Sequence, residues 1–134
     1  MSLFRLGEFT LASGQPSRWK IDCDGLTADD WQALAAMAVE VLPPFRCVHG
    51  VPRGGLPFAA ALERYITARP SDPVLIAEDV VTTGRSMERY VAGLIHSWHP
   101  DAYERVGVCV FARGSVVPSW VTPLFQMPQR PEVR

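Results

Sequence analysis

The most informative segment of this 134-residue chain is Val74-Leu75-Ile76-Ala77-Glu78-Asp79-Val80-Val81-Thr82-Thr83-Gly84-Arg85-Ser86. Four apolar residues run into two acids, and a short loop rich in hydroxyl groups leads into a helix expected from Met87 to Trp98. The loop N–H groups, the helix N-terminus and the hydroxyls of Thr82, Thr83 and Ser86 can hold a phosphate. The acids can take ribose hydroxyls, directly or through a metal. The segment therefore predicts a sugar-phosphate site at the carboxyl end of a buried strand, where ligands sit in open α/β sheets.

This segment resembles the phosphoribosyl-pyrophosphate signature of the type I phosphoribosyltransferases. That family pattern is a hydrophobic strand, an acidic pair, two apolar residues, Thr-Thr-Gly, any residue, and then Ser or Thr, and every position fits. The resemblance implies Mg²⁺ contacts of the Glu78 and Asp79 carboxylates, made indirectly through ribose or water. It also implies ribose and phosphate binding by Glu78, Asp79, Val80, Val81, Thr82, Thr83, Gly84, Arg85 and Ser86. A structural alternative stays open, in which Ser86 only caps the helix and the two acids are only solvated.

A second candidate for an anion site is the loop Gly50-Val51-Pro52-Arg53-Gly54-Gly55-Leu56, which follows an expected strand and opens an expected helix. Its glycines let backbone N–H groups approach a phosphate, and Arg53 adds a forked cation suited to phosphate oxygens. In the type I family a loop here binds the pyrophosphate, often through a strained or cis non-proline peptide. The resemblance thus assigns Val51, Pro52, Arg53 and Gly54 to pyrophosphate, and makes Arg53 and Asp79 the catalytic candidates. The alternative is a plain strand-to-helix turn.

The N-terminal stretch indicates which branch of the type I family this chain resembles. The residues Gly7 to Gly14, then Ser17 and Ile21-Asp22-Cys23, are similar to the opening of orotate phosphoribosyltransferases, where such a segment forms a small hood over the base. Trp19 and Lys20 fall where that family usually carries two aromatic residues, so Lys20 departs from the pattern. Both residues are base-binding candidates by this resemblance. The alternative is a hairpin that only covers one end of the core.

Arg113 is the third base-binding candidate. The segment Phe111-Ala112-Arg113-Gly114 ends the strand expected after the signature helix. In the orotate enzymes an acid followed by an arginine often stands here, and the arginine meets the carboxylate of the base. Arg113 fits that pattern and Ala112 does not. An arginine forked onto a carboxylate is physically sensible, and an arginine in solvent at the end of a strand is the alternative.

The order of expected elements indicates a doubly wound, mainly parallel α/β sheet, because strands alternate with helices. We expect a single domain over 1–134, with a hood-like hairpin in 1–25, an α/β core in 26–128 and a loose tail in 129–134. Thr27 is the expected N-cap of a helix whose apolar spacing runs to Leu42. The expected strands are Phe9–Leu11, Trp19–Ile21, Arg46–His49, Val106–Phe111 and Trp120–Phe125, the last confined to an edge by Pro123.

Composition and charge exclude several classes of partner. The formal net charge is −1 and no long basic stretch exists, which argues against nucleic acid or an anionic membrane as the main partner. No apolar run reaches the length of a membrane span. Cys23, Cys47 and Cys109 form no C-x-x-C pair, so reduced thiols in a cytoplasmic protein fit better than a disulfide framework or a zinc site.

The resemblance implies transfer of the phosphoribosyl group from phosphoribosyl pyrophosphate to a nucleobase, most like orotate, with Mg²⁺ as cofactor and pyrophosphate as product. The largest departure from the orotate enzymes is the lack of one long loop. Orotate enzymes carry a long mobile loop between the helix after the pyrophosphate loop and the signature strand. Here only Ile66 to Pro73 separates that expected helix from the signature strand. Without the long loop, Arg53 is the one obvious cation for the pyrophosphate, unless Lys20 or a second subunit helps. The alternatives are a non-catalytic regulatory protein that binds phosphoribosyl pyrophosphate or a nucleoside monophosphate, and an interaction protein without a ligand.

Overall fold

The computed structural model describes residues 2–11, 14–95, 104–114 and 117–128. The end of the expected signature helix at Trp98 and the tail 129–134 lie outside these residues. The helices are α1 (Ala28–Val41), α2 (Leu56–Leu62) and α3 (Arg85–Ile95), and short 3-10 turns cover Cys23–Gly25 and Glu63–Tyr65. The strands are β1 (Phe4–Thr10), β2 (Pro16–Ile21), β3 (Cys47–Gly50), β4 (Val74–Val81), β5 (Arg105–Ala112) and β6 (Val121–Gln126).

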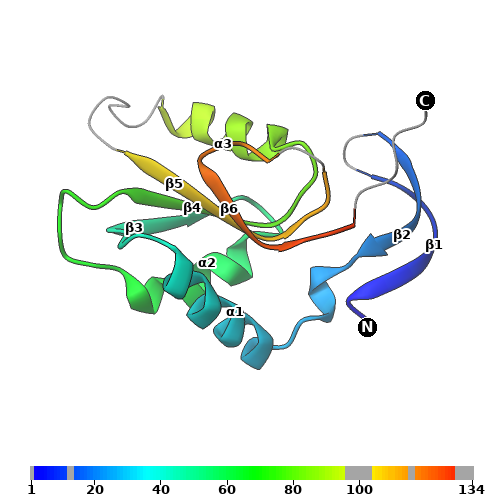
Figure 1. Ribbon diagram of the computed structural model, residues 1–134, viewed down its shortest axis with the longest axis horizontal. Coiled ribbons are helices and arrows are strands. Elements are labelled where there is room, and N and C mark those ends of the chain that lie inside the picture. Colours follow the sequence, from blue (N-terminus) through cyan, green and yellow to red (C-terminus); the bar gives the residue numbers. More distant parts are fainter. Residues whose placement is uncertain (1, 12–13, 96–103, 115–116, 129–134) are drawn as a thin grey trace.

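The four later strands form one parallel sheet in the order β3-β4-β5-β6, and helices cover both of its faces (Figure 1). The predicted α/β class and doubly wound architecture are therefore confirmed. β6 is an edge strand, as Pro123 predicts, and Pro123 lies opposite Cys109 of β5. Because the strands are parallel, the loops that follow β3, β4 and β5 meet at one end of the sheet.

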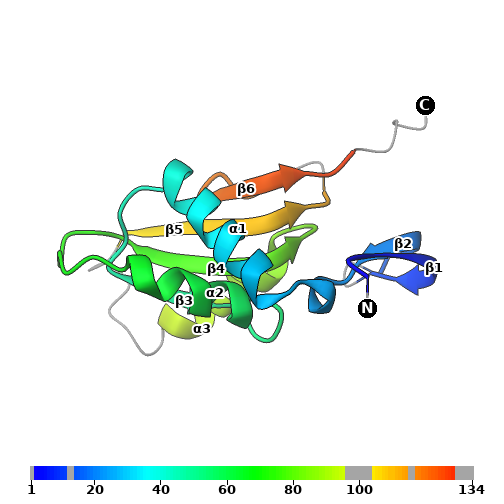
Figure 2. The ribbon, with the colours of Figure 1, turned by 90° about the horizontal axis from the view of Figure 1, so that it is seen from below.

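The two helical crossovers in this sheet have opposite hands. The strands run across the sheet in chain order, yet α1 and α2 lie on one face and α3 on the other (Figure 2). In this view the crossover from β3 through α2 to β4 is left-handed, which occurs in roughly 2% of such connections. A right-handed crossover would have delivered the chain to the far side of β3. The left-handed return leaves β3 as the other edge of the sheet.

The apolar residues divide into two clusters, one on each face of the sheet. Helices α1 and α2 contribute Trp31, Leu34 and Phe58 to the first cluster, with Leu75 of β4 beneath them. Helix α3 contributes Met87 and Val91 to the second, against residues of β4 and β5 that include Cys109. The alternation of side chains along the central strands feeds both clusters, which explains why these strands read as continuous apolar runs.

Helix α1 begins at the predicted cap. The Thr27 hydroxyl accepts from the Asp30 N–H at 3.1 Å, and the Asp30 carboxylate accepts from the Thr27 N–H at 2.9 Å, which is a complete capping box. Trp31, Leu34, Ala35 and Ala38 are buried, as their helical spacing predicts. Val41, which continues the same helical spacing, is 59% exposed. It occupies the last turn, where the helix leaves the sheet before Pro43.

The N-terminal segment forms the predicted hairpin, but both of its strands are longer than predicted. β1 pairs antiparallel with β2 and begins at Phe4, not at Phe9. Tertiary packing explains the extension, because the Phe4 ring meets the Phe111 ring edge-on with 6.1 Å between centroids. Figure 1 shows the hairpin projecting beside the end of the sheet where β5 and β6 finish.

The connector between α2 and β4 lies at the opposite end of the sheet from this hairpin (Figure 1). The Thr67 N–H donates to the Phe45 carbonyl, just before β3, and the Thr67 hydroxyl donates to Asp72. The Arg46 N–H donates to the Pro73 carbonyl at 3.0 Å. These bonds fasten the connector beside the amino-terminal ends of β3 and β4, away from the carboxyl ends where ligands bind in such sheets.

Candidate functional site

The acidic pair lies inside β4, and the expectation that the strand stops at these acids was wrong. The strand continues to Val81, because Glu78, Val80 and Val81 all pair with residues of β5. Glu78 is 6% exposed and Asp79 is half-buried. The Asp79 N–H donates to Glu78 Oε1 at 3.1 Å, and the Val80 N–H donates to Asp79 Oδ1 at 2.7 Å. Both carboxyl groups are therefore held by neighbouring backbone.

Glu78 is the most strongly perturbed acid of this site. Burial raises its pKa first, and a hydrogen bond to the Asp79 side chain and the Asp79 charge raise it further, to about 9. At neutral pH the raised pKa therefore favours the protonated form of Glu78. A carboxylic acid that can donate and a carboxylate that accepts suit two different hydroxyl or metal-water partners.

The turn after β4 leads into α3 with Thr83 as the capping side chain. The Arg85 N–H donates to Thr83 Oγ1 at 3.3 Å, and the Glu88 N–H donates to the Gly84 carbonyl. Ser86 lies within the first helical turn and is exposed, so the alternative in which Ser86 caps the helix was wrong. Thr83 and Ser86 thus both stand at the helix N-terminus, where N–H groups face outward.

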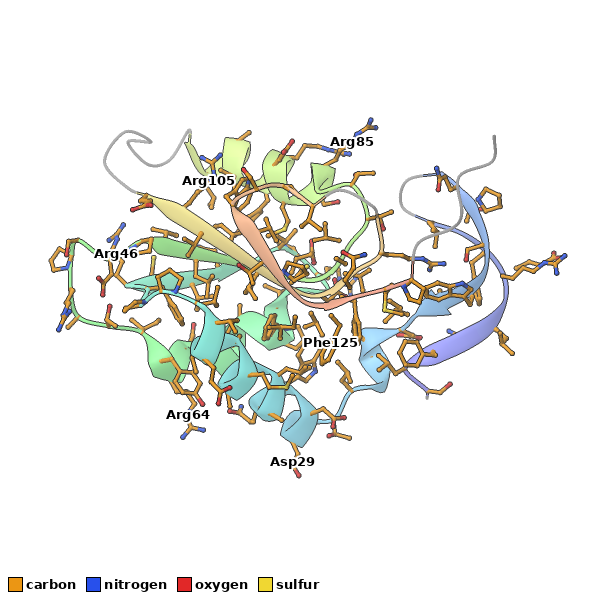
Figure 3. The ribbon with its side chains drawn as sticks, viewed as in Figure 1. Asp29, Arg46, Arg64, Arg85, Arg105 and Phe125 are labelled. Atoms are coloured by element: carbon orange, nitrogen blue, oxygen red, sulfur yellow. The ribbon has the colours of Figure 1, made fainter. Side chains whose placement is uncertain are left out.

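Gly84 has a positive φ of 83°, which favours glycine, and a Cβ atom there would lie 2.4 Å from the Pro118 ring. The turn that follows β4 therefore packs closely against the segment before β6. Figure 3 shows the Arg85 side chain projecting outward from the start of α3. Of the predicted phosphate-binding residues, Val81 is buried, Thr82 is half-buried and Thr83 is exposed.

The loop after β3 packs directly against the acidic pair. The Val51 N–H donates to the Ala77 carbonyl at 2.9 Å, and the peptide bond between Pro52 and Arg53 is cis. Pro52, Arg53 and Gly54 are exposed. A Cβ atom on Gly54 would lie 2.3 Å from Asp79 Oδ2, so only glycine allows this approach. The structure thus joins the two predicted anion loops through Gly54 and Asp79, which are 25 residues apart in the sequence.

Arg113 lies at the carboxyl end of β5, beside the signature turn. Its backbone N–H donates to the Val81 carbonyl at 2.8 Å. A Cβ atom on Gly114 would overlap the Thr82 carbonyl oxygen. Gln126 of β6 holds this segment by donating to the Gly114 carbonyl at 3.1 Å. The Arg113 guanidinium carbon lies 3.5 Å from the centroid of the Trp19 ring. The structure therefore brings Trp19 and Arg113 together next to the turn that follows β4.

Lys20 does not share this arrangement. Neighbouring residues of a strand point to opposite faces, so Lys20 and Trp19 leave β2 on different sides. The Lys20 ammonium lies 5.0 Å from the centroid of the Phe9 ring, on the hairpin itself. Ser17, which the sequence did not identify as a site residue, is instead the polar side chain buried at the junction. A serine in a turn-rich segment gives no sequence signal for burial, because that depends on Arg113 far along the chain.

The described residues limit what else this region can bind. They contain no group of three or more His, Cys, Asp or Glu side chains arranged for a metal ion. Glu78 and Asp79 supply two carboxyl groups, and Mg²⁺ commonly binds through one or two carboxylates together with water and substrate phosphates. The donor set therefore fits a Mg²⁺ ion whose other ligands come from the substrate. No helix in the described part of the chain combines the length and apolar character of a membrane span.

The sequence matches no protein-family model and no curated protein. Solved structures are similar. Orotate phosphoribosyltransferase from Aeropyrum pernix is 24% identical with a TM-score of 0.74, covering 92% of this chain and 88% of that one. The Mycobacterium tuberculosis enzyme in complex with inorganic phosphate is 19% identical with a TM-score of 0.64, covering 90% and 86%. A hypoxanthine-guanine phosphoribosyltransferase from Bacillus anthracis is 14% identical with a TM-score of 0.51, covering 78% and 82%.

These likenesses define the class of fold: the chain has the α/β fold of the type I phosphoribosyltransferases. Among the three structures, the two orotate phosphoribosyltransferases have higher TM-scores than the hypoxanthine-guanine enzyme. The family suspected from the signature segment is thus the one whose fold this chain shares.

Proposed function

We propose that this protein binds phosphoribosyl pyrophosphate and transfers its phosphoribosyl group to a nucleobase, with an orotate-like pyrimidine as the preferred base. One observation carries the proposal. The carboxyl ends of three adjacent parallel strands bring together an anion loop, an acidic pair and a capped turn, with Gly54 against Asp79 and Arg113 bonded to Val81. Such a cluster matches the three parts of the substrate: pyrophosphate, ribose and 5′-phosphate.

In this proposal the turn from Thr82 to Ser86 binds the 5′-phosphate. The exposed hydroxyls of Thr83 and Ser86 stand beside the N–H groups at the start of α3, which is an arrangement suited to an anion. The related Mycobacterium tuberculosis orotate phosphoribosyltransferase was solved with inorganic phosphate. Asp79 and Glu78 then face the ribose hydroxyls, one as an acceptor and the other as a donor.

The loop from Val51 to Gly54 binds the pyrophosphate, and Arg53 supplies its charge. Arg53 is exposed, so its guanidinium can reach phosphate oxygens without breaking a buried contact. Mg²⁺, held by substrate oxygens and indirectly by Glu78 and Asp79, would neutralise part of the pyrophosphate charge. The Gly54 contact with Asp79 fixes how far the pyrophosphate loop stands from the ribose acids.

The reaction forms a bond from a ring nitrogen of the base to C1′ and breaks the bond from C1′ to pyrophosphate. Pyrophosphate leaves with the electron pair, and the proton of the base nitrogen passes to solvent. The transition state resembles an oxocarbenium ion, so the negative Asp79 and the aligned reactants supply most of the catalysis. Covalent chemistry by the protein is not needed. Burial raises the pKa of Cys23 and Cys109 to about 12, which leaves both thiols protonated.

A second candidate function is a regulatory protein that binds phosphoribosyl pyrophosphate or a nucleotide without turnover. The connector between α2 and β4 favours it, because Thr67 and Asp72 fasten that segment near Phe45, away from the proposed site. A lid would exclude water and bring cations to the leaving pyrophosphate. The connector cannot do so from where it lies.

Turnover separates these two candidates. Purified protein would be incubated with phosphoribosyl pyrophosphate, Mg²⁺ and single bases (orotate, uracil, hypoxanthine, guanine and adenine), and pyrophosphate release would be followed. The proposed function predicts release with orotate above that with the other bases, and loss of release in Asp79→Asn. Binding of phosphoribosyl pyrophosphate without release for any base would instead establish the regulatory function. Absence of binding would reject both.

A further inference from the structure

A buried polar network joins the hairpin to the end of β5. Ser17 of β2 is 5% exposed, and its hydroxyl donates to the Trp19 carbonyl at 2.7 Å. The same oxygen accepts from the Trp19 N–H at 3.3 Å and from Arg113 Nη2. A hydroxyl has one donor and two acceptor sites, so Ser17 uses its full capacity here. A buried and fully satisfied hydroxyl fixes the groups that it contacts.

The Trp19 indole ring stacks on the face of the Arg113 guanidinium. The 3.5 Å between the Arg113 guanidinium carbon and the indole centroid is a stacked cation–π contact. Stacking uses the face of the guanidinium, whereas hydrogen bonds use its edge, which carries five N–H donors. The Arg113 N–H is bonded to Val81, so the backbone of this residue is fixed next to the turn after β4. Three contacts thus set the position and the plane of one cation beside the proposed ribose site.

We propose that Ser17 and Trp19 are positioning residues that aim Arg113 at a carboxylate on the base, and so determine the preference for a carboxylated pyrimidine. This inference rests on the proposed function. A carboxylate is a stronger acceptor than a neutral oxygen, so it takes precedence at the guanidinium edge. Because specificity is a difference between two affinities, a misaligned Arg113 loses the preference without losing the other contacts of the nucleotide.

The test compares two nucleotides that differ in the carboxylate alone, orotidine 5′-monophosphate and uridine 5′-monophosphate, by calorimetric titration. The wild type is expected to bind the carboxylated nucleotide about tenfold more tightly, as for one hydrogen-bonded charge. In Ser17→Ala that ratio should fall to about one, with the affinity for uridine 5′-monophosphate within about twofold of wild type. In Trp19→Leu, which also removes a base-binding candidate, the ratio should fall likewise. Trp19→Phe keeps an aromatic face and should retain most of the ratio. Thr10→Ala, at an exposed hairpin residue, is the control and should keep all of it.

A second measurement needs no ligand. The Trp19 ring current should shift the side-chain NMR signals of Arg113 upfield in the wild type, and Ser17→Ala should move them toward free-arginine values. Equal loss of both nucleotides in Ser17→Ala, or an unchanged ratio with displaced Arg113 signals, would overturn the positioning role. A wild type that binds phosphoribosyl pyrophosphate but does not prefer the carboxylated nucleotide would overturn this inference and the orotate preference, while phosphoribosyl transfer to another base would stand. A wild type that fails to bind phosphoribosyl pyrophosphate would reject the proposed function itself.

Discussion

Gly54 packs so closely on Asp79 that a methyl group on the glycine would lie 2.3 Å from a carboxylate oxygen. The contact joins the loop after β3 to the acid within β4, and it explains why a larger residue cannot stand at position 54. The Asp79 side chain has little room to retreat, because its Oδ1 accepts from the Val80 N–H at 2.7 Å. The spacing between the two halves of the proposed site is therefore set by a single glycine.

Gly54→Ala is predicted to weaken the binding of phosphoribosyl pyrophosphate by about fivefold or more, because the added methyl group displaces the Asp79 carboxylate or the loop. The measurement is a calorimetric titration in the presence of Mg²⁺. Gly93→Ala in α3 is the matched control, since a Cβ atom there meets nothing within 4 Å. The control should bind normally and gain about 0.5–1 kcal/mol in the free energy of unfolding. Equal affinities in the two variants would show that the Gly54 contact is not part of the site.

Thr83→Ala is predicted to have two separable effects. Loss of the hydroxyl should weaken the binding of a nucleoside monophosphate by about 1–3 kcal/mol, the range for hydrogen bonds to charged groups. Loss of the bond from the Arg85 N–H should lower the free energy of unfolding by about 1 kcal/mol. Thr83→Ser retains the hydroxyl and should restore both. An alanine variant that is less stable but binds the nucleotide with unchanged affinity would leave Thr83 as a helix cap alone.

Glu78→Gln is predicted to remove a pH dependence of stability in the ligand-free protein. The folded-state pKa of Glu78 is raised by burial, so between its unfolded value and its folded value the native state holds the extra proton. Stability from this group is complete below the unfolded pKa and falls as the pH rises toward the folded pKa. Glutamine cannot ionise, so relative to wild type the variant should gain about 1.4 kcal/mol for each pH unit above the unfolded pKa, up to the folded pKa, and therefore clearly more at pH 8 than at pH 4.5. The check is urea unfolding at both values, and equal differences at both would contradict the assignment.

The double substitution Glu78→Gln, Asp79→Asn is predicted to abolish the effect of Mg²⁺ on affinity for phosphoribosyl pyrophosphate. The two carboxyl groups are the donors that the site offers to a substrate-bound ion, and the amide variants keep their size while removing the charge. Titrations with and without Mg²⁺ measure the effect directly. Tighter binding with Mg²⁺ in the double variant would mean that the ion is held by the substrate without help from these acids.

The local parts of this structure were predictable from the sequence. The capping box at Thr27 depends on residues three apart, and the signature segment contains its own strand, turn and helix start. The long-range contacts were not predictable. Ser17 and Arg113 are 96 positions apart, and nothing near either residue indicates the other. The early start of β1 has the same cause, since Phe4 pairs with Phe111.

The crossover through α2 illustrates a different limit. A strand, a helix and a strand in sequence predict a right-handed connection, because most such connections are right-handed. The chain from α2 to β4 is short and is tied at Thr67 to the Phe45 carbonyl. The hand of this crossover depends on how the whole sheet is assembled. The position of β3 at the edge of the sheet follows from that hand. Sequence alone identified the missing lid as a short connector, but its location at the far end of the sheet came from the structure.

Turnover by the isolated chain is predicted to be slow and to depend on protein concentration, because closure of the site would require a second copy of the chain. Arg53 is the exposed cation of the proposed pyrophosphate loop, and the connector from Ile66 to Pro73 lies too far away to add another. Pyrophosphate release would be measured with orotate over a range of protein concentrations, together with the molecular mass in solution. Fast release by a demonstrated monomer, independent of concentration, would show that the lid is dispensable.

In the proposed function, the carboxyl ends of β3, β4 and β5 form one site for phosphoribosyl pyrophosphate. The most direct measurement is a calorimetric titration of the wild type with this compound and Mg²⁺, beside Gly54→Ala, Thr83→Ala and Gly93→Ala. We expect saturable binding at one site per chain, weakened by the first two substitutions and unchanged by the third. Absence of saturable binding, or an affinity that is the same in all four proteins, would contradict it.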